Sequence, residues 1–179
     1  MEVRGARIVI AVALVALVGA LAAPSAHPGK ASNQVALSSL ESGVLTELNG
    51  IRAQHGLKPV QLSARLTASA AQHSKEMGVD GYFEHTSHDG TAFWKRIGHW
   101  YGATGYGYWS VGENLLWSSP DVDPAGALKL WMNSPEHRAN ILNGSWREIG
   151  ISAMHFDAAP GAYKGLEVTI ITTDFGVRR

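Results

Sequence analysis

Apolar residues in the first half of the chain recur at helical intervals. Ser38 and Glu41 have the spacing of a capping box, which predicts that a helix begins there, and Gly56 predicts its end. Between these signals the apolar positions lie three or four residues apart, at Leu40, Val44, Leu48 and Ile51. The pattern predicts an amphipathic helix that packs one face against a core.

Four further helices follow from the same reasoning. One is predicted from Ser63 to Gly78, with Leu66, Ala70, His73 and Met77 on one face. A short helix is predicted through 93–100, and another over about 124–132. Ser134 and Pro135 then favour a new start, because serine is a preferred N-cap and proline a preferred first helical residue.

The end of the chain changes to a period of two. Apolar residues alternate with small or polar ones over 148–156 and again from 166 to about 175, which predicts two strands. The segment 157–165 contains Pro160 and Gly161 and suits a loose hairpin. Helices that precede a late antiparallel sheet indicate the α+β class.

The N-terminus predicts a targeting segment. Arg4 and Arg7 precede an apolar run that extends to about Ala23, and small residues follow it. This order is typical of a secretory signal peptide, here residues 1–26. The alternative is an uncleaved anchor, but the run is short for a membrane span and Pro24 interrupts it. Residues 27–37 are predicted to be a flexible linker, and residues 38–179 a single domain.

Composition narrows the function classes. The formal net charge is zero, so the basic face that nucleic-acid binding requires is not indicated. The chain has no cysteine, which excludes disulfides and a lipoprotein anchor. A secreted domain of this length must therefore be stabilised by its core alone.

Three polar segments carry the candidate chemistry. They contain His85 in 83–87, Glu113 in 112–114 and His137 in 134–142, each flanked by apolar residues. Two imidazoles and a carboxylate suit either a divalent metal or general acid–base chemistry. Glu113 stands between Gly112 and Asn114, a composition that predicts a tight turn.

These segments resemble the CAP superfamily, also called the SCP domain, in its cysteine-free bacterial branch. The resemblance runs from about Leu45 to Gly176. The matching segments, besides the one around His85, are Leu48-Asn49-Gly50-Ile51-Arg52, Gly112-Glu113-Asn114, Trp131-Met132-Asn133-Ser134-Pro135, His137-Arg138-Ala139-Asn140-Ile141-Leu142, Glu148-Ile149-Gly150-Ile151 and Thr173-Asp174-Phe175-Gly176. The resemblance implies a three-layer α-β-α sandwich with a central antiparallel sheet.

The resemblance also implies a cleft. His85 and His137 match the two histidines of the family's tetrad, and Glu113 matches its first glutamate. Ser134 stands where animal and plant members carry a second glutamate, so paired carboxylates are not expected. Glu136, two residues on, is separated by a proline and a helix start. The implied cleft is therefore His85, Glu113, His137 and Ser134, with His85 and His137 as the metal ligands, for Zn²⁺ or another weakly bound divalent cation.

Other histidines and the aromatic residues have simpler interpretations. His88 is three residues from His85 and is expected to be a peripheral loop residue, and His73 to be a hydrogen-bonded core residue. Ten of the 15 aromatic residues lie between Tyr82 and Trp117. They favour core packing, with an aromatic platform beside the cleft for a sugar, peptidoglycan or lipid as the alternative.

The expected function is that of a binding module, secreted or in the cell envelope, for a divalent cation and a lipid, sterol or cell-wall ligand. One alternative is a metal-dependent hydrolase of peptide or cell-wall material, with Glu113 as the general base. Another is a structural envelope protein with a vestigial cleft. No nucleic-acid partner and no membrane span after cleavage are expected, and the domain is expected to be a monomer.

Overall fold

A computed structural model describes residues 37–179 and, for the backbone alone, residues 16–18. Five α-helices, one short 3₁₀ helix and five strands are formed by these residues. In chain order they are β1 (Ala16–Val18), α1 (Ser39–Gln54), β2 (Gln61–Leu62), α2 (Ala64–Asp80), α3 (Phe93–Trp100), β3 (Trp109–Ser118), α4 (Pro124–Asn133), α5 (Pro135–Ile141), β4 (Glu148–Ala159), η1 (Gly161–Tyr163) and β5 (Leu166–Arg178).

The strands form one sheet in the order β1-β3-β5-β4-β2. The long strands β3, β5 and β4 are antiparallel neighbours, and β2 adds a short parallel edge beside β4. β4 and β5 are consecutive in the chain and are joined through η1, so the predicted hairpin is confirmed. The central antiparallel sheet is confirmed as well.

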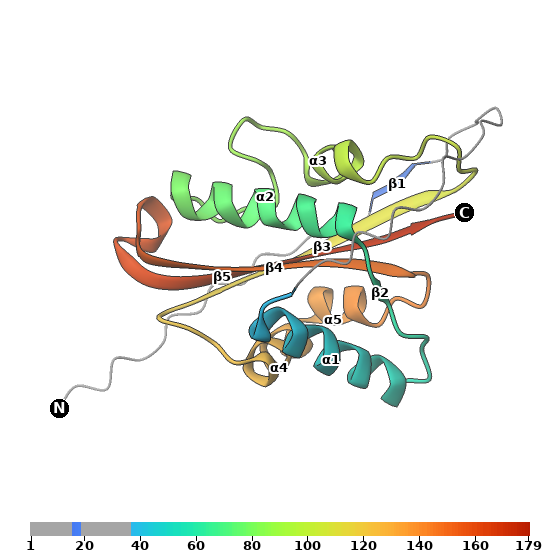
Figure 1. Ribbon diagram of the computed structural model, residues 1–179, viewed down its shortest axis with the longest axis horizontal. Coiled ribbons are helices and arrows are strands. Elements are labelled where there is room, and N and C mark those ends of the chain that lie inside the picture. Colours follow the sequence, from blue (N-terminus) through green and yellow to red (C-terminus); the bar gives the residue numbers. More distant parts are fainter. Residues whose placement is uncertain (1–15, 19–36) are drawn as a thin grey trace.

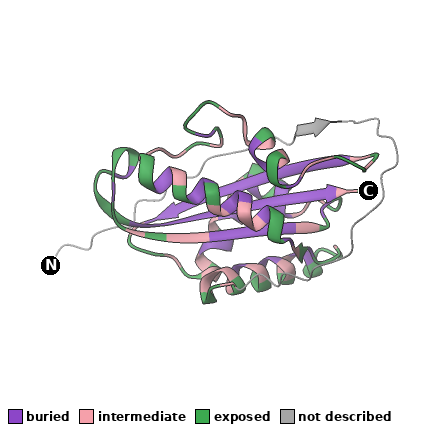
Figure 2. Ribbon diagram, turned by 45° about the horizontal axis from the view of Figure 1, so that its top comes forward, coloured by how far each residue is buried: buried purple, intermediate pink, exposed green. Residues whose placement is uncertain are grey.

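Helices cover both faces of this sheet. α2 and α3 lie on one side, and α1, α4 and α5 lie on the other (Figure 1). Most residues of β3 and β5 are buried, while β4 becomes partly exposed toward its end and the outward faces of the helices are exposed (Figure 2). The α+β class and the three-layer arrangement are confirmed.

The helix starts follow from their caps. The Ser38 hydroxyl accepts from the Glu41 amide at 3.3 Å, and the Glu41 carboxylate accepts from the Ser38 amide at 2.8 Å. Both halves of the capping box are therefore present. At Ser134 the chain leaves α4 and starts α5 with Pro135 as its first residue, as predicted.

The predicted end of α2 at Gly78 is wrong. The helix continues to Asp80 and ends at Gly81, whose φ of 72° lies in the left-handed region that glycine adopts readily. Gly78 serves packing instead, because a Cβ atom there would lie 2.2 Å from the ring of Phe156 on β4.

The expected turn around Glu113 is also wrong. Glu113 lies in the middle of β3, opposite Asp174 of β5. All ten residues of β3 are buried, so the strand has no alternation that the sequence could display. Gly112 is required by close packing, since a Cβ atom there would lie 2.6 Å from Oδ1 of Asn140.

The predicted signal peptide and linker lie almost entirely outside the described residues. Of residues 1–37, only 16–18 and Leu37 are described, and 16–18 pair with Trp109–Val111 of β3 at the edge of the sheet. The targeting segment stays a prediction. Within the part of the chain that the structure describes, no helix has both the length and the apolar character to cross a membrane.

Candidate functional site

Glu113 occupies the centre of the α2/α3 face of the sheet. Neighbours at every second position of β3 share this face, so Trp109 and Val111 lie on one side of Glu113 and Leu115 and Trp117 on the other. Trp109 and Val111 belong to one apolar cluster, while Leu115 and Trp117 belong to another. The Glu113 side chain is completely buried between the two clusters.

Both carboxylate oxygens of Glu113 are occupied. Oε1 accepts from Nδ1 of His85 at 2.8 Å, and Oε2 forms an ion pair with the guanidinium of Arg96 on α3. The same guanidinium donates through Nη1 to the backbone oxygen of His85 and to Oγ of Ser87, each at 3.1 Å. Arg96 therefore holds both the carboxylate and the loop that carries the imidazole.

The charge of Glu113 follows from this geometry. Burial alone would raise the pKa of Glu113. The positive charge of Arg96, with smaller contributions from His73 and His85, outweighs burial and lowers that pKa to about 2. Glu113 is consequently an ionised acceptor at neutral pH.

An ionised acceptor fixes the tautomer of His85. Because the carboxylate can only accept, Nδ1 of His85 must carry the proton, and the Nε2 lone pair of the neutral ring is free for another partner. Nε2 is buried and has no hydrogen-bond partner among the described residues. A carboxylate that orients an imidazole in this way is the usual arrangement behind a metal-ligating histidine.

A second carboxyl group lies directly opposite Glu113 on the neighbouring strand. Asp174 is completely buried, and neither of its oxygens has a hydrogen-bond partner in the described part of the chain. Burial first, and the negative charge of Glu113 second, raise the pKa of Asp174 well above its usual value. Burial and the charge of Glu113 therefore favour the protonated form of Asp174.

His137 lies on α5 and is buried. Its backbone oxygen accepts from the side chain of Asn114, the residue after Glu113, at 3.2 Å. The structure thus joins His85 and Glu113 by direct contact, whereas His137 is held through Asn114, whose side chain lies on the opposite face of the sheet from Glu113. His137 falls in the first turn of α5, as the sequence predicts.

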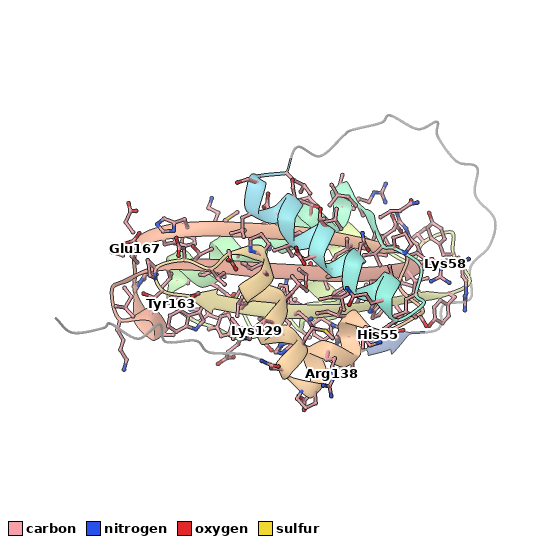
Figure 3. All side chains as sticks on the ribbon, turned by 90° about the horizontal axis from the view of Figure 1, so that it is seen from below. His55, Lys58, Lys129, Arg138, Tyr163 and Glu167 are labelled. Carbon is pink, nitrogen blue, oxygen red and sulfur yellow. The ribbon has the colours of Figure 1, made fainter. Side chains whose placement is uncertain are left out.

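The position of the absent second glutamate is polar but uncharged. Ser134 is half-buried, and its hydroxyl contacts the carboxylate of Glu136 at 3.5 Å. Glu136 itself is exposed on α5. Figure 3 shows the helical layer of α1, α4 and α5 from outside, with Lys129 labelled on α4 and Arg138 labelled on α5.

The remaining histidines behave as the sequence suggests. His73 is completely buried, and its Nε2 lies 2.9 Å from the backbone oxygen of Glu84. His88 is exposed in the loop, with its ring 5.5 Å from that of Tyr82. Of the ten clustered aromatic residues only Trp100 is exposed, which supports the core-packing interpretation.

Sequence reasoning missed Arg96 and Asp174, although both left a signal. Arg96 falls on the same helical face as Phe93, Ile97 and Trp100, where a charge is unusual. Asp174 continues the alternation that starts at Leu166, and so falls on the inward face of β5. A charge at an inward position of a predicted element is the feature that could have found them.

The described residues do not complete a zinc site. Zn²⁺ in proteins usually has at least three protein ligands, and no group of three or more histidine, cysteine, aspartate or glutamate side chains suited to a metal ion occurs in residues 37–179. The buried, unpartnered Nε2 of His85 fits a single imidazole ligand. The arrangement suits weak capture of a cation, not a closed structural site.

Comparison with known proteins gives the family. Residues 45–164 match the family model described as "CAP: Cysteine-rich secretory protein family". The Bacillus subtilis (strain 168) protein YkwD is 34% identical over 116 residues, which is 64% of this chain and 42% of YkwD. The membrane protein YlbC of the same organism is 29% identical over 113 residues, 62% of this chain and 30% of YlbC. Both are described as uncharacterized, and the chain spans less than half the length of either.

Solved structures agree with the fold. An extracellular protein containing an SCP domain from Bacillus anthracis str. Ames has a TM-score of 0.55 at 26% identity, with 82% of this chain and 45% of that chain covered. An outer surface protein from Borrelia burgdorferi has a TM-score of 0.57 at 18% identity, with 76% and 90% covered. A cysteine-rich secretory protein from Staphylococcus aureus has a TM-score of 0.56 at 18% identity, with 85% of this chain and 42% of that chain covered. Because the family model matches more than half of this cysteine-free chain, the chain belongs to the CAP family.

Proposed function

We propose that this CAP domain is a secreted binding module in which the centre formed by His85, Glu113 and Arg96 captures a divalent cation and an adjoining lipid, sterol or cell-envelope ligand. One observation carries the choice of binding over catalysis. Both oxygens of Glu113 are already committed, to His85 and to Arg96. A general base needs a free lone pair and a pKa near the working pH. Glu113 is completely buried and its pKa is lowered to about 2, far from a neutral working pH, which weighs against the hydrolase.

Glu113 acts in this proposal through His85. It holds the Nδ1 proton and so presents the Nε2 lone pair, which is what a cation such as Zn²⁺ requires. His137 is the second proposed ligand, on the basis of the family's tetrad. Two imidazoles bind a divalent cation weakly, so the site would be filled reversibly. A bound cation would supply a positive charge to which an anionic ligand group could add.

Two observations support secretion. The N-terminal pattern is that of a signal peptide, and the similar Bacillus anthracis and Borrelia burgdorferi proteins are described as an extracellular and an outer surface protein. N-terminal sequencing of material from the medium tests this part. A chain that still begins at Met1 and sediments with membranes would contradict it.

Zinc titration calorimetry tests the site. His85→Ala and His137→Ala should each abolish measurable binding, whereas His88→Ala, in the same loop as His85, should leave it unchanged. Glu113→Gln should weaken binding roughly 10–100-fold. If the amide oxygen stays with Arg96, the amide NH₂ faces Nδ1, and the His85 proton must move to Nε2.

The same variant separates the two functions. Release of labelled fragments from casein and peptidoglycan is measured in parallel, at a zinc concentration that saturates both proteins. The proposal expects no turnover by either protein. Turnover by the wild-type protein that disappears in Glu113→Gln at full zinc occupancy would overturn the binding module in favour of the hydrolase.

A further inference from the structure

A polar cavity of about 280 Å³ lies beside the histidine centre, between α2, the loop after it and α3. Its wall includes Ser87 and Arg96, whereas His85 and Glu113 do not line it. The volume is near the lower end of the range for small-molecule pockets, so it suits a ligand of only a few heavy atoms. The cavity is therefore a separate compartment that shares one residue, Arg96, with the centre described above.

The inner wall of this cavity carries a buried guanidinium group. Arg96 is 3% exposed and Ser87 is 7% exposed, so these two form its buried side. The terminal nitrogens of Arg96 are bonded, but its Nε has no hydrogen-bond partner among the described residues. A buried guanidinium N–H without an acceptor is unfavourable. The positive charge of Arg96 favours a ligand carboxylate on this side of the cavity.

The rim adds charges of both signs. Glu76 on α2 and Asp89 in the loop are the acids, while Lys95 and His99 on α3 face the same cavity. Glu76 is held in place by Gln72 and Tyr82, whose side chains donate to it at 2.8 and 3.2 Å. The imidazole of His73, whose Nδ1 lies 3.7 Å from the carboxylate, is the main cause that lowers the pKa of Glu76 to about 2, so this carboxylate is ionised at neutral pH.

Opposite charges on two walls suit a ligand that itself carries both signs. A simple anion would meet Glu76 and Asp89, and a simple cation would meet Arg96 and Lys95. We propose that this cavity binds a small zwitterion, an amino acid or a short peptide terminus, with its carboxylate toward Arg96 and its ammonium toward Glu76 and Asp89. The inference does not depend on a cation at His85.

Calorimetry on the full chain, in the presence of a chelator, tests the inference with three probes. The dipeptide alanyl-alanine carries both a positive and a negative charge. Propionate carries only the negative charge, and ethylamine carries only the positive charge. The dipeptide should bind at least tenfold more tightly than either single-charge probe, because each charge-assisted hydrogen bond contributes about that factor. Equal binding of propionate and dipeptide would overturn the zwitterion in favour of a plain anion site.

Variants of the acidic residues proposed to contact the ligand's ammonium group test whether the dipeptide binds in this cavity. Glu76→Gln and Asp89→Asn should each weaken dipeptide binding about tenfold. Asp89 is exposed, so its variant keeps the fold intact. Glu47→Gln is the matched control, since Glu47 is exposed on α1 on the other side of the sheet, and should change nothing. No dipeptide binding, or binding that Asp89→Asn leaves unchanged, would overturn the proposal. Because zinc is chelated, neither result bears on the cation site.

Discussion

The two faces of the central sheet are built on different principles. The face under α1, α4 and α5 is a continuous apolar cluster. The face under α2 and α3 has two smaller apolar clusters with a polar centre between them. That centre contains Glu113 and Asp174 from the sheet and His73, Ser69 and Ser74 from α2, all with no exposed surface. The face under α1, α4 and α5 therefore stabilises the domain through continuous apolar packing. On the face under α2 and α3, buried polar and charged residues separate the apolar clusters.

Polar groups on the apolar face are largely tied to backbone. Arg52 of α1 donates to the backbone oxygens of Ile141, Asn143 and Lys58 at 2.6, 3.0 and 3.1 Å. Asn140 of α5 donates to the backbone oxygen of Glu113 and to Asn114. Such bonds position α1 and α5 and leave the sheet contacts apolar. Nη2 of Arg52 has no hydrogen-bond partner in the described part of the chain, but the bonds that Arg52 and Asn140 do make are explained by the fold.

The polar centre on the other face is not explained by the fold alone. An ion pair in a protein interior rarely stabilises more than apolar residues of the same volume would. Here it is accompanied by a second buried carboxyl group, that of Asp174, and by the buried Nε2 of His85, which has no hydrogen-bond partner among the described residues. Unsatisfied buried groups of this kind are typical of sites that bind something. The comparison therefore assigns a functional role to the polar centre under α2 and α3, while the continuous apolar cluster on the other face mainly stabilises the domain.

The largest effect is expected when the charge pair is broken. Arg96→Met leaves Glu113 ionised and buried without its cation, which should lower the free energy of unfolding by about 3–5 kcal/mol. Urea denaturation at neutral pH measures this value. Arg65→Met, at an exposed position on α2, is the control and should stay within about 0.5 kcal/mol of the wild-type protein. If both variants lost the same free energy of unfolding, the buried ion pair would be no more important for stability than an exposed arginine.

A pH-dependent effect is expected at Asp174. The unfolded chain releases this proton near pH 3.8, whereas the folded chain keeps it to much higher pH. The folded state then binds more protons, so this group lowers stability as pH rises, by up to about 1.4 kcal/mol per pH unit. Asp174→Asn should match the wild-type stability near pH 3 and exceed it increasingly above pH 4. Parallel stability curves for the two proteins would show that Asp174 is ionised in the fold.

The pH dependence of stability that Glu113 contributes has the opposite sign to that of Asp174. Its pKa is lowered from 4.5 to about 2, so its stabilising contribution is complete above about pH 5 and is lost as pH falls toward 2. Acid unfolding of the wild-type protein should therefore begin below pH 4.5, and Glu113→Gln should flatten that limb. Far-UV circular dichroism between pH 2 and 6 measures the difference. A limb that remains equally steep in the variant would place the acid-sensitive group elsewhere.

The smallest effect is expected on the apolar face. Ile151 of β4 is completely buried in the continuous cluster, and Ile151→Val should cost about 0.5–1.5 kcal/mol. The loss should be independent of pH, because no titratable group responds to one missing methylene. Urea denaturation at pH 3 and pH 7 checks both points. A pH-dependent loss would mean that the two faces are not energetically separate.

The sequence predicted the helices better than it predicted β3. Ser38 with Glu41, and Ser134 with Pro135, are local signals, and α1 and α5 start where these residues indicate. β3 is buried on both sides, so it offered no alternation, and Gly112 beside Glu113 favoured a turn. What decides that segment is the pairing with β5, which is a property of the tertiary structure.

The site shows the same division. His85 and Glu113 could be proposed from the family's motif, and the structure brings them into contact. Arg96 carries no motif, and its role appears only when α3 packs over β3. Asp174 lies opposite Glu113 because of the pairing register of β3 and β5, which cannot be deduced from the sequence. Charges that respond to one another across elements are the part that needed the fold.

The central claim is that the ion pair of Arg96 and Glu113 is kept for the site and not for the fold. The unfolding free energy of the double variant Arg96→Met/Glu113→Met tests it most directly, because both charges are removed together while side-chain volume is nearly kept. The account predicts a value within about 1 kcal/mol of the wild-type protein, or above it, with zinc binding lost. A double variant that remains about 3–5 kcal/mol less stable, as Arg96→Met alone is expected to be, would contradict it.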